Sequence, residues 1–269
     1  MFVTNFSAIS KQYEKDSIIQ KSASEVLFDM LDIQPDDNVL DLGCGTGNIT
    51  RSIKEKTRGN VVGIDLSEGM IQKAQAKNAG QDIIFLQGSA EKLNYENEFD
   101  IIFCNSVFQW FKKPMPALSA CRNALKKNGK MAIQAPARVD YCPNFIDAIQ
   151  EVRKDRDTKD IFAGFTSPWL FFNTAEEYSD LFKDAGFTIR ESTIDKVVTE
   201  HTPEEVYTIF ESGAAAGYLN QECYNATITQ DYVKLFRKIV RDSFNRQADD
   251  KGKVELIFYR IYLLAVKTM

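Results

Sequence analysis

Three alternating glycines and one acid have the types and spacing of a ligand-binding site. Gly43, Gly45 and Gly47 follow a short apolar run and precede a helical pattern. Glycine permits positive φ and close approach of the backbone to a ligand, and the N-terminus of the following helix offers free N–H groups. Asp65 stands at the end of a second apolar run, where its carboxylate can accept hydrogen bonds from two adjacent ribose hydroxyls. Together these residues predict a site for the nucleoside part of a cofactor.

The elements that position these residues alternate between strand and helix. Short apolar runs predict five strands in the first half, over residues 38–42, 60–65, 82–87, 99–104 and 130–135. Helical spacing predicts helices over residues 17–32, 48–56, 67–77 and 116–127, the third capped by Ser67 and the fourth closed by Asn128 and Gly129. This alternation predicts an α/β fold whose parallel strands are buried on both faces.

The second half of the sequence is less regular. It predicts irregular and helical structure over 140–172, a helix over 175–184, a strand over 188–199, two or three helices over 203–247 and a final strand over 254–266. In an open α/β sheet, ligands bind beyond the carboxyl ends of the strands. If the fifth and sixth strands run parallel to the first, the insertions that follow them leave the sheet at the edge of the glycine loop. We therefore expect these insertions to form a lid over the ligand.

Two segments carry a resemblance to a known family. Residues 39–47 (VLDLGCGTG) and 63–70 (GIDLSEGM) are similar to the first two motifs of class I S-adenosylmethionine-dependent methyltransferases, and the resemblance covers about residues 5–135. It implies a Rossmann-like, seven-stranded, mostly parallel sheet and S-adenosyl-L-methionine as the cofactor. The third motif of the family usually reads Gly-Asp-Ala, and this chain has Ser89 in place of the acid. The residues implied or expected to bind the cofactor are Asp41, Gly43, Cys44, Gly45, Gly47, Asp65, Leu66, Met70, Ser89, Ala90, Glu91, Asn105 and Gln20.

The start of the chain and residues 105–110 narrow the expected reaction. Residues 6–23 and the segment NSVFQW at 105–110 resemble malonyl-acyl-carrier-protein O-methyltransferases and trans-aconitate methyltransferases, which methylate free carboxylates. A carboxylate is ionised at pH 7, so this reaction requires positioning rather than a general base. We therefore predict no catalytic acid or base and no metal, with a small or acyl-carrier-bound acid as substrate. The residues expected to bind this acid are Tyr13, Gln109, Trp110 and Trp169.

The length and composition favour one domain, because 269 residues with 44% hydrophobic content suit a single large core. We expect a single methyltransferase domain over residues 1–269. Its parts are an N-terminal helical segment (1–36), a cofactor-binding core (37–139), two substrate-lid insertions (140–185 and 201–253) and the last strand (254–267). Outside the motifs, Arg138 is a candidate partner for a substrate acid, and the single histidine, His201, is interpreted as a loop residue.

Other functions stay open on the sequence alone. The acceptor can instead be an amine, a hydroxyl or a ring carbon, and the chain can also bind S-adenosylmethionine without catalysis. A dinucleotide cofactor is disfavoured because the fingerprint GxGxxG requires glycine at position 48, where this chain has Asn48. Nucleic-acid binding is disfavoured because 33 basic and 38 acidic residues give a formal charge of −5.

The sequence also bears on where the protein acts. Its five cysteines include no CxxC pair, which favours a reducing compartment over a disulfide framework or a zinc site. No apolar run suits a signal peptide or a membrane span. We therefore expect a cytoplasmic protein with no membrane partner, and the oligomeric state stays open.

Overall fold

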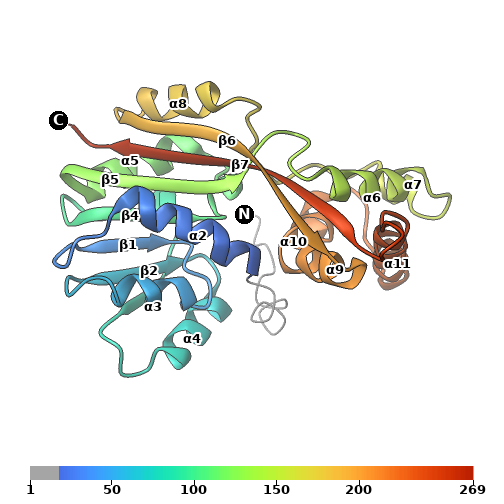
Figure 1. Cartoon of the computed structure of the whole chain (residues 1–269), viewed down its shortest axis with the longest axis horizontal. Coiled ribbons are helices and arrows are strands. Elements are labelled where there is room, and N and C mark those ends of the chain that lie inside the picture. The colour runs from blue at the N-terminus through green and yellow to red at the C-terminus, as the bar shows by residue number, and fades with distance from the viewer. Residues whose placement is uncertain (1–17, 269) are drawn as a thin grey trace. The chain divides into compact units, whose positions relative to one another are not determined.

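The computed structural model describes residues 18–268, with side chains from Ser24 onward (Figure 1). These residues divide into two compact units. The first, called the sheet unit here, comprises residues 18–139, 170–195 and 260–268. The second, called the helical unit, comprises residues 140–169 and 196–259. The prediction of one domain with two lid insertions therefore stays a prediction, and each unit is described by itself.

A seven-stranded sheet forms the first unit, as predicted. The strands are β1 (Val39–Leu42), β2 (Val61–Asp65), β3 (Ile84–Gln87), β4 (Phe99–Asn105), β5 (Leu125–Pro136), β6 (Thr188–His201) and β7 (Val254–Val266). Their order is β3-β2-β1-β4-β5-β7-β6. The pairs β1–β2, β1–β4, β2–β3 and β4–β5 are parallel, and β5–β7 is antiparallel. The carboxyl ends of the first five strands therefore meet at one edge of the sheet, and the glycine loop lies there.

Helices cover both faces of this sheet. Those of the sheet unit are α2 (Ile18–Leu31), α3 (Asn48–Lys54), α4 (Glu68–Lys77), α5 (Pro114–Ala124) and α8 (Ala175–Asp184), with short 3₁₀ turns η1 (Ala90–Lys92) and η2 (Phe108–Trp110). On one face, Leu27 and Leu31 of α2 pack with Ile101 and Phe103 of β4. On the other face, buried residues of α5 and α8 pack against alternate residues of the same strands. Burial on both faces accounts for the continuous apolar runs that predict β1, β2 and β4. β3 lies at the edge of the sheet with Ile84 and Leu86 exposed, so the expected burial on both faces is wrong for this strand.

The junction between α5 and β5 differs from the prediction. We expected a helix over 116–127 closed by Asn128 and Gly129, but α5 ends at Ala124 and β5 begins at Leu125. The Asn128 N–H donates to the Lys267 carbonyl at 2.8 Å, and the Lys267 N–H donates to the Gly129 carbonyl at 2.9 Å. Pairing with a segment far away in the sequence thus overrides the local helix preference of residues 125–127.

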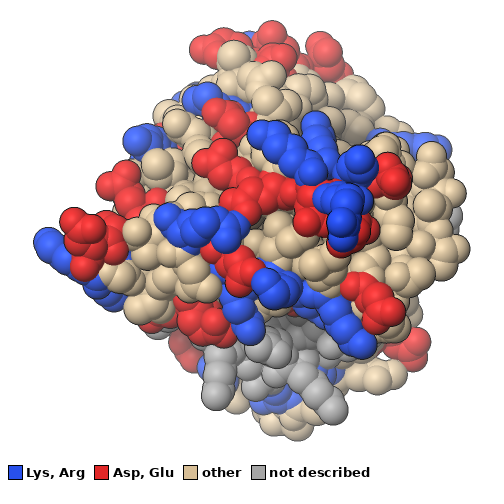
Figure 2. Space-filling view, turned by 90° about the vertical axis from the view of Figure 1, so that its right-hand side faces the viewer, with Lys and Arg blue, Asp and Glu red and all other residues tan. Residues whose placement is uncertain are grey.

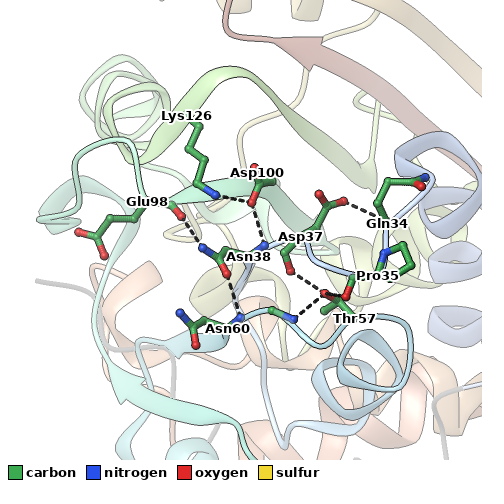
Figure 3. Close-up of polar contacts among 10 residues, drawn as sticks. Gln34, Pro35, Asp37, Asn38, Thr57, Asn60, Glu98, Asp100 and Lys126 are labelled. Carbon is green, nitrogen blue, oxygen red and sulfur yellow. Dashed lines mark hydrogen bonds and ion pairs between the residues drawn. The ribbon is translucent and has the colours of Figure 1, made fainter.

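Polar contacts fix the opposite, amino-terminal edge of the sheet (Figure 3). The Asn38 N–H, just before β1, donates to Asp100 Oδ2 in β4 at 2.9 Å, and Lys126 forms an ion pair with the same oxygen at 2.7 Å. The Asn60 N–H, just before β2, donates to Asn38 Oδ1 at 2.9 Å, and Thr57 Oγ1 donates to the Asp37 carbonyl at 2.7 Å. These bonds align the starts of β1, β2 and β4. They therefore also set the positions at which the carboxyl ends of these strands meet.

The helical unit is built around aromatic side chains. Its helices are α6 (Pro143–Lys154), α7 (Lys159–Phe162), α9 (Pro203–Ser212), α10 (Ala215–Tyr218) and α11 (Gln230–Arg246), with the 3₁₀ turn η3 (Gln221–Cys223). The ring of Phe145 lies 5.2 Å from that of Phe210 and 5.6 Å from that of Phe244. A Cβ added at Gly217 would lie 2.1 Å from Trp169 Cζ2. Close packing against this indole therefore explains why position 217 is glycine.

Five buried cysteines stand outside any disulfide, namely Cys44, Cys104, Cys121, Cys142 and Cys223. None of the described helices has the length and apolar character needed to cross a membrane. Within the described residues, no group of three or more His, Cys, Asp or Glu side chains is placed to hold a metal ion.

Candidate cofactor and acceptor site

The glycine loop connects β1 to α3 with left-handed backbone at each of its three glycines. The φ angles are 80° at Gly43, 54° at Gly45 and 78° at Gly47, values that side-chain-bearing residues rarely adopt. A Cβ at Gly43 would lie 2.1 Å from Val107 Cγ2, in the loop after β4. A Cβ at Gly47 would lie 2.8 Å from Phe85 Cζ, in β3. The glycines therefore let the loop pack closely against β3 and the loop after β4. They also leave the outer side of the loop without side chains at these three positions.

Asp65 organises the loop from the end of β2. Its Oδ2 accepts the Gly45 N–H at 2.9 Å, and its Oδ1 accepts the Ser67 N–H at 2.8 Å. Burial raises the pKa of Asp65 above its ordinary value, and these two hydrogen bonds oppose that rise. Because a carboxylate oxygen can accept two hydrogen bonds, both oxygens keep capacity for ligand hydroxyls. The carboxylate thus suits the predicted role of binding a ribose.

Asp41 and Cys44 lie beneath the loop. The Thr50 hydroxyl in α3 donates to Asp41 Oδ2 at 2.6 Å. Burial raises the pKa of Asp41 to about 7, with Asp65 adding to the rise and the Thr50 bond opposing it. Burial also raises the pKa of the Cys44 thiol far above its ordinary value, so this thiol stays neutral rather than becoming a nucleophile. The structure thus places both residues as supports of the loop, and direct contact with the cofactor stays a prediction.

The residues after β2 and β3 form the second part of the predicted cofactor site. Leu66 is 42% exposed, whereas Met70 of α4 is buried. Ser67 caps α4 by accepting the Met70 N–H at 3.3 Å, which confirms the predicted cap. Ser89 precedes η1, in which Ala90 is buried and Glu91 is exposed. The Gly88 N–H donates to the Asp65 carbonyl at 3.0 Å, so the β3 end lies against the acid that the sequence predicted to hold the ribose.

Asn105 ends β4 with an amide that has no partner. The side chain is buried, and neither Nδ2 nor Oδ1 makes a hydrogen bond within the described residues. The following residue, Ser106, has a φ of 59° and so turns the chain sharply at the strand end. The Ser106 N–H donates to the Gln134 carbonyl at 2.7 Å, and its hydroxyl donates to Gln134 Oε1 at 2.9 Å. A buried amide without partners is costly, which indicates that a ligand supplies them.

Gln109 and Trp110 lie in η2, just after this turn. Gln109 Nε2 donates to the Ser106 carbonyl at 2.9 Å, and the Gln109 carbonyl accepts the Leu170 N–H at 2.8 Å. Gln109 Oε1 is buried without a hydrogen-bond partner in the described chain. Trp110 is half-buried. Both residues therefore stay candidates for binding the acceptor, although half of the Gln109 amide is used to hold the turn.

Other predicted residues lie elsewhere. Trp169 belongs to the helical unit, where its ring lies 4.9 Å from that of Tyr218. Tyr13 and the side chain of Gln20 fall outside the described residues. Arg138 follows β5 with a φ of 72°, and its N–H donates to the Phe172 carbonyl at 2.9 Å. His201 ends β6, with Nε2 2.9 Å from Thr199 Oγ1, rather than lying in a loop. The structure thus brings together the residues of the loop, β2, β3, β4 and η2.

Sequence reasoning missed several supports of this site. Thr50, Val107, Ser106 and Gln134 bond to or pack against the predicted residues. The position of Thr50, three residues after Gly47, was a readable signal, because the first turn of α3 must face the end of β1. Ser106 and Val107 lie within the segment NSVFQW, but nothing in that segment indicates which contacts they make. Gln134 has no local signal, since its contacts depend on how distant strands pair.

The site fits S-adenosylmethionine in three respects. The glycine loop offers open backbone, Asp65 offers a carboxylate with spare acceptor capacity, and Asn105 offers an unpartnered amide at the adjacent strand end. Residues 43–47 and Asp65 would hold the amino-acid and ribose parts, in keeping with their predicted roles. Asn105 Oδ1 would face the part of the cofactor nearest β4, and Asn105 Nδ2, which also has no partner among the described residues, stays available to an acceptor.

Comparison with known proteins supports this assignment. A family described as "Methyltransferase domain" matches residues 40–133. The chain is 24% identical to a malonyl-[acyl-carrier protein] O-methyltransferase of Priestia megaterium, over 98% of this chain and 96% of the relative. It is 27% identical to a trans-aconitate 2-methyltransferase of Rhizobium rhizogenes, over 86% and 88% of the two chains. The fold is similar to that of the YcgJ protein of Bacillus subtilis, with a TM-score of 0.62, 16% identity and coverage of 93% and 99%.

Proposed function

Because this chain is a class I S-adenosylmethionine-dependent methyltransferase, we propose that it methylates a carboxylate oxygen of a small organic acid. The observation that carries the proposal is the presence of uncharged side-chain amides at the end of β4. Among the described residues, Asn105 and Gln109 both keep buried amide atoms without partners there. The names of the two relatives, which refer to a malonyl group and to trans-aconitate, agree with an acid as the acceptor.

Amides suit this reaction because a carboxylate acceptor carries no proton that must be removed. Bound S-adenosylmethionine supplies a methyl group on a positively charged sulfur. The task of the chain is then to orient one carboxylate oxygen toward that methyl group, which is catalysis by positioning. The amide N–H groups of Asn105 can hold the other oxygen without neutralising the attacking one. Ser106 and Gln134 hold the turn that presents this amide.

A free acid is favoured over a carrier-bound acid by the charges on the helical unit. Docking of an acidic carrier protein would need a surface with an excess of positive charge. On the face in Figure 2, basic and acidic side chains are interleaved. Arg237 pairs with Glu211 at 3.0 Å, and Lys238 forms a similar pair with Asp242. Local neutralisation of the basic residues leaves this face poorly suited to such a carrier.

The test is methyl transfer from labelled S-adenosylmethionine by the full chain to a panel of acceptors. The panel contains crotonate, fumarate, trans-aconitate, malonyl-acyl-carrier protein and ethanolamine. We expect transfer to at least one free acid, with a product that releases its label as methanol in mild alkali, because methyl esters hydrolyse and N- or C-methyl groups do not. Transfer to ethanolamine with an alkali-stable product, or to the carrier-bound acid alone, would contradict the proposal.

A further inference from the structure

One face of the sheet carries a row of polar side chains at the carboxyl ends of three neighbouring strands. Asn105 of β4 pairs with Gln134 of β5, and Gln134 pairs with Tyr262 of β7. Pro136 of β5 pairs with Arg260 of β7, one step further along the same face. Paired residues of a sheet share a face, and so do residues two apart on a strand. Asn105, Gln134, Tyr262 and Arg260 are therefore neighbours on one face, and we call them the acceptor row.

On the same face, the positions next to the acceptor row and further from the carboxyl ends of β4 and β5 are occupied by apolar side chains. One step back along the strands, the corresponding positions are Phe103, Ala132 and Leu264, which belong to or pack against the hydrophobic core under α2. All four members of the row are buried, with exposed fractions of 8% for Asn105, 1% for Gln134, 5% for Tyr262 and 5% for Arg260. Burial of polar and charged groups opposes folding unless they have partners. A change from apolar to polar at the ligand-binding edge of the sheet is therefore a sign of function.

The chemistry of the row changes along its length. Next to the glycine loop it presents the unpartnered Asn105 amide. Its far end, on β7, presents Arg260, which shares a hydrogen bond with the Tyr262 hydroxyl. A guanidinium is a planar fork of N–H donors that matches a carboxylate in geometry and charge. Asp195 of β6, an exposed residue, also acts electrostatically on Tyr262, and solvent weakens its effect on this end of the row.

Strand spacing sets the distance between these two ends. Neighbouring strands lie about 5 Å apart, so β7 is about 10 Å from β4. An acceptor whose reacting carboxylate lies at the end of β4 cannot place that same group against residues of β7. A second acidic group on a short carbon chain can reach toward them.

We propose that Arg260 and Tyr262 form a subsite for a second carboxylate of the acceptor, which makes the acceptor a small di- or tricarboxylic acid. This inference rests on the proposed function, because it assumes that the first carboxylate receives the methyl group. Arg260 is a specificity-determining residue in this view. It fixes the end of the acceptor that does not react, and the positioned acceptor then presents its other carboxylate at Asn105.

The experiment compares three variants, Arg260→Met, Arg260→Lys and Tyr262→Phe, with the unchanged full chain. KM and kcat are measured with crotonate, fumarate and trans-aconitate, which carry one, two and three carboxylates. Calorimetry measures trans-aconitate binding to each protein loaded with S-adenosylhomocysteine. Arg190→Met serves as the matched control, because Arg190 is an exposed arginine of β6 in the same unit.

We expect Arg260→Met to raise KM for the two polycarboxylates about 10- to 100-fold, the usual worth of a hydrogen bond to a charged group. KM for crotonate should change less than about twofold, since crotonate has no second carboxylate. Tyr262→Phe should raise KM for the polycarboxylates about fivefold, and Arg260→Lys should fall between Tyr262→Phe and Arg260→Met. Arg190→Met should behave like the unchanged chain. The affinity for trans-aconitate should fall in parallel with the rise in KM.

Two results would overturn the inference while leaving the proposed function intact. One is an equal loss with crotonate and with the polycarboxylates in Arg260→Met, which would indicate a general structural effect. The other is an unchanged preference between the acids in all three variants. If the unchanged chain gives no alkali-labile product with any acid, the proposed function itself fails, and the inference fails with it. Far-ultraviolet circular dichroism and the melting temperature identify a variant that has not folded, in which case Tyr262→Phe alone decides the question.

Discussion

The Asp65 carboxylate bonds to the backbone at two places, Gly45 in the glycine loop and Ser67 at the start of α4. Both bonds leave acceptor capacity on each oxygen, and burial makes each remaining hydrogen bond stronger than it would be in water. The residue therefore couples the shape of the loop to recognition of the cofactor sugar.

Replacement of this acid provides the sharpest test of the cofactor site. We expect Asp65→Asn to weaken S-adenosylmethionine binding about 10- to 100-fold, because hydrogen bonds to a charged group are lost. Isothermal titration calorimetry measures the change. Glu96→Gln is the matched control, since Glu96 is an exposed acid of the same unit, in the loop before β4 and outside the predicted site. Equal losses in the two variants would show that the effect does not come from a contact between Asp65 and the cofactor.

Asp41 makes the stability of the fold depend on pH in an unusual direction. Burial raises its pKa in the folded chain to about 7 from its ordinary value of 3.8. Between these two pH values the unfolded chain releases this proton and the folded chain keeps it. The contribution of Asp41 to the free energy of unfolding is therefore fully present at low pH and decreases as the pH rises toward 7.

Asp41→Asn removes this titration. We expect the free energy of unfolding of the unchanged chain, minus that of Asp41→Asn, to fall by roughly 1.4 kcal/mol per pH unit between about pH 4.5 and 6.5, and to level off above pH 7. Urea unfolding at four pH values measures this difference. A constant offset, as from loss of the Thr50 hydrogen bond alone, would show that Asp41 is ionised throughout this range.

At the scale of elements, β1, β2 and β4 could be predicted closely because burial on both faces demands continuous apolar runs. The last strand, over 254–266, and the helix over 175–184 have the predicted bounds. The start of β5 could not be predicted, because Leu125 becomes a strand residue only through pairing with Phe99. Local preferences of Lys126 and Lys127 point to helix, and the partner strand decides otherwise.

The candidate site likewise contains residues that could be predicted from local sequence and residues that depend on the pairing of distant strands. Glycines and Asp65 could be found from the sequence because their roles follow from residue type and from position at a strand end. The acceptor row could not be found, since Gln134 and Tyr262 become neighbours only when β7 enters the sheet beside β5. No local pattern carries the register between strands so far apart in the sequence.

The contact between the glycine loop and the loop after β4 gives a prediction at this scale. Gly43→Ala places a methyl group where Val107 Cγ2 lies 2.1 Å away, at a φ of 80°. We expect a loss of about 1–3 kcal/mol in the free energy of unfolding, together with weaker binding of S-adenosylhomocysteine. Urea unfolding and calorimetry measure the two effects.

A second substitution separates the two causes of that loss. Gly43→Ala combined with Val107→Ala removes the two closest contacts, to Cγ2 at 2.1 Å and Cγ1 at 2.8 Å, while the Cβ of residue 107 at 2.9 Å and the strained φ remain. Partial recovery of stability relative to Gly43→Ala is therefore expected. Full recovery would mean that the backbone conformation at position 43 costs nothing, and no recovery would mean that the clash is irrelevant.

At the scale of the whole molecule, two strands belong to both units. β6 passes from the sheet unit to the helical unit after Asp195, and β7 passes from the helical unit to the sheet unit after Tyr259. Neither strand can be disordered in one unit without shortening the ladder that continues in the other. The chain is therefore expected to unfold as one cooperative system despite its division.

The two tryptophans allow this expectation to be measured. Trp110 lies in the sheet unit and Trp169 in the helical unit, and the sequence holds two tryptophans in all. The variants Trp110→Phe and Trp169→Phe each leave one fluorescent reporter. We expect the fluorescence of each variant to change at the same urea concentration as its own circular dichroism. Two separated transitions in either variant would show that the units unfold independently.

The buried thiols have a practical consequence for handling the enzyme. Because all five cysteines are buried and outside any disulfide, a maleimide reagent can reach them only when the chain opens. The number of labels gained with time, read by mass spectrometry, then measures the rate at which the folded chain opens. Slower labelling in the presence of cofactor or acid would report occupancy without any assay of turnover.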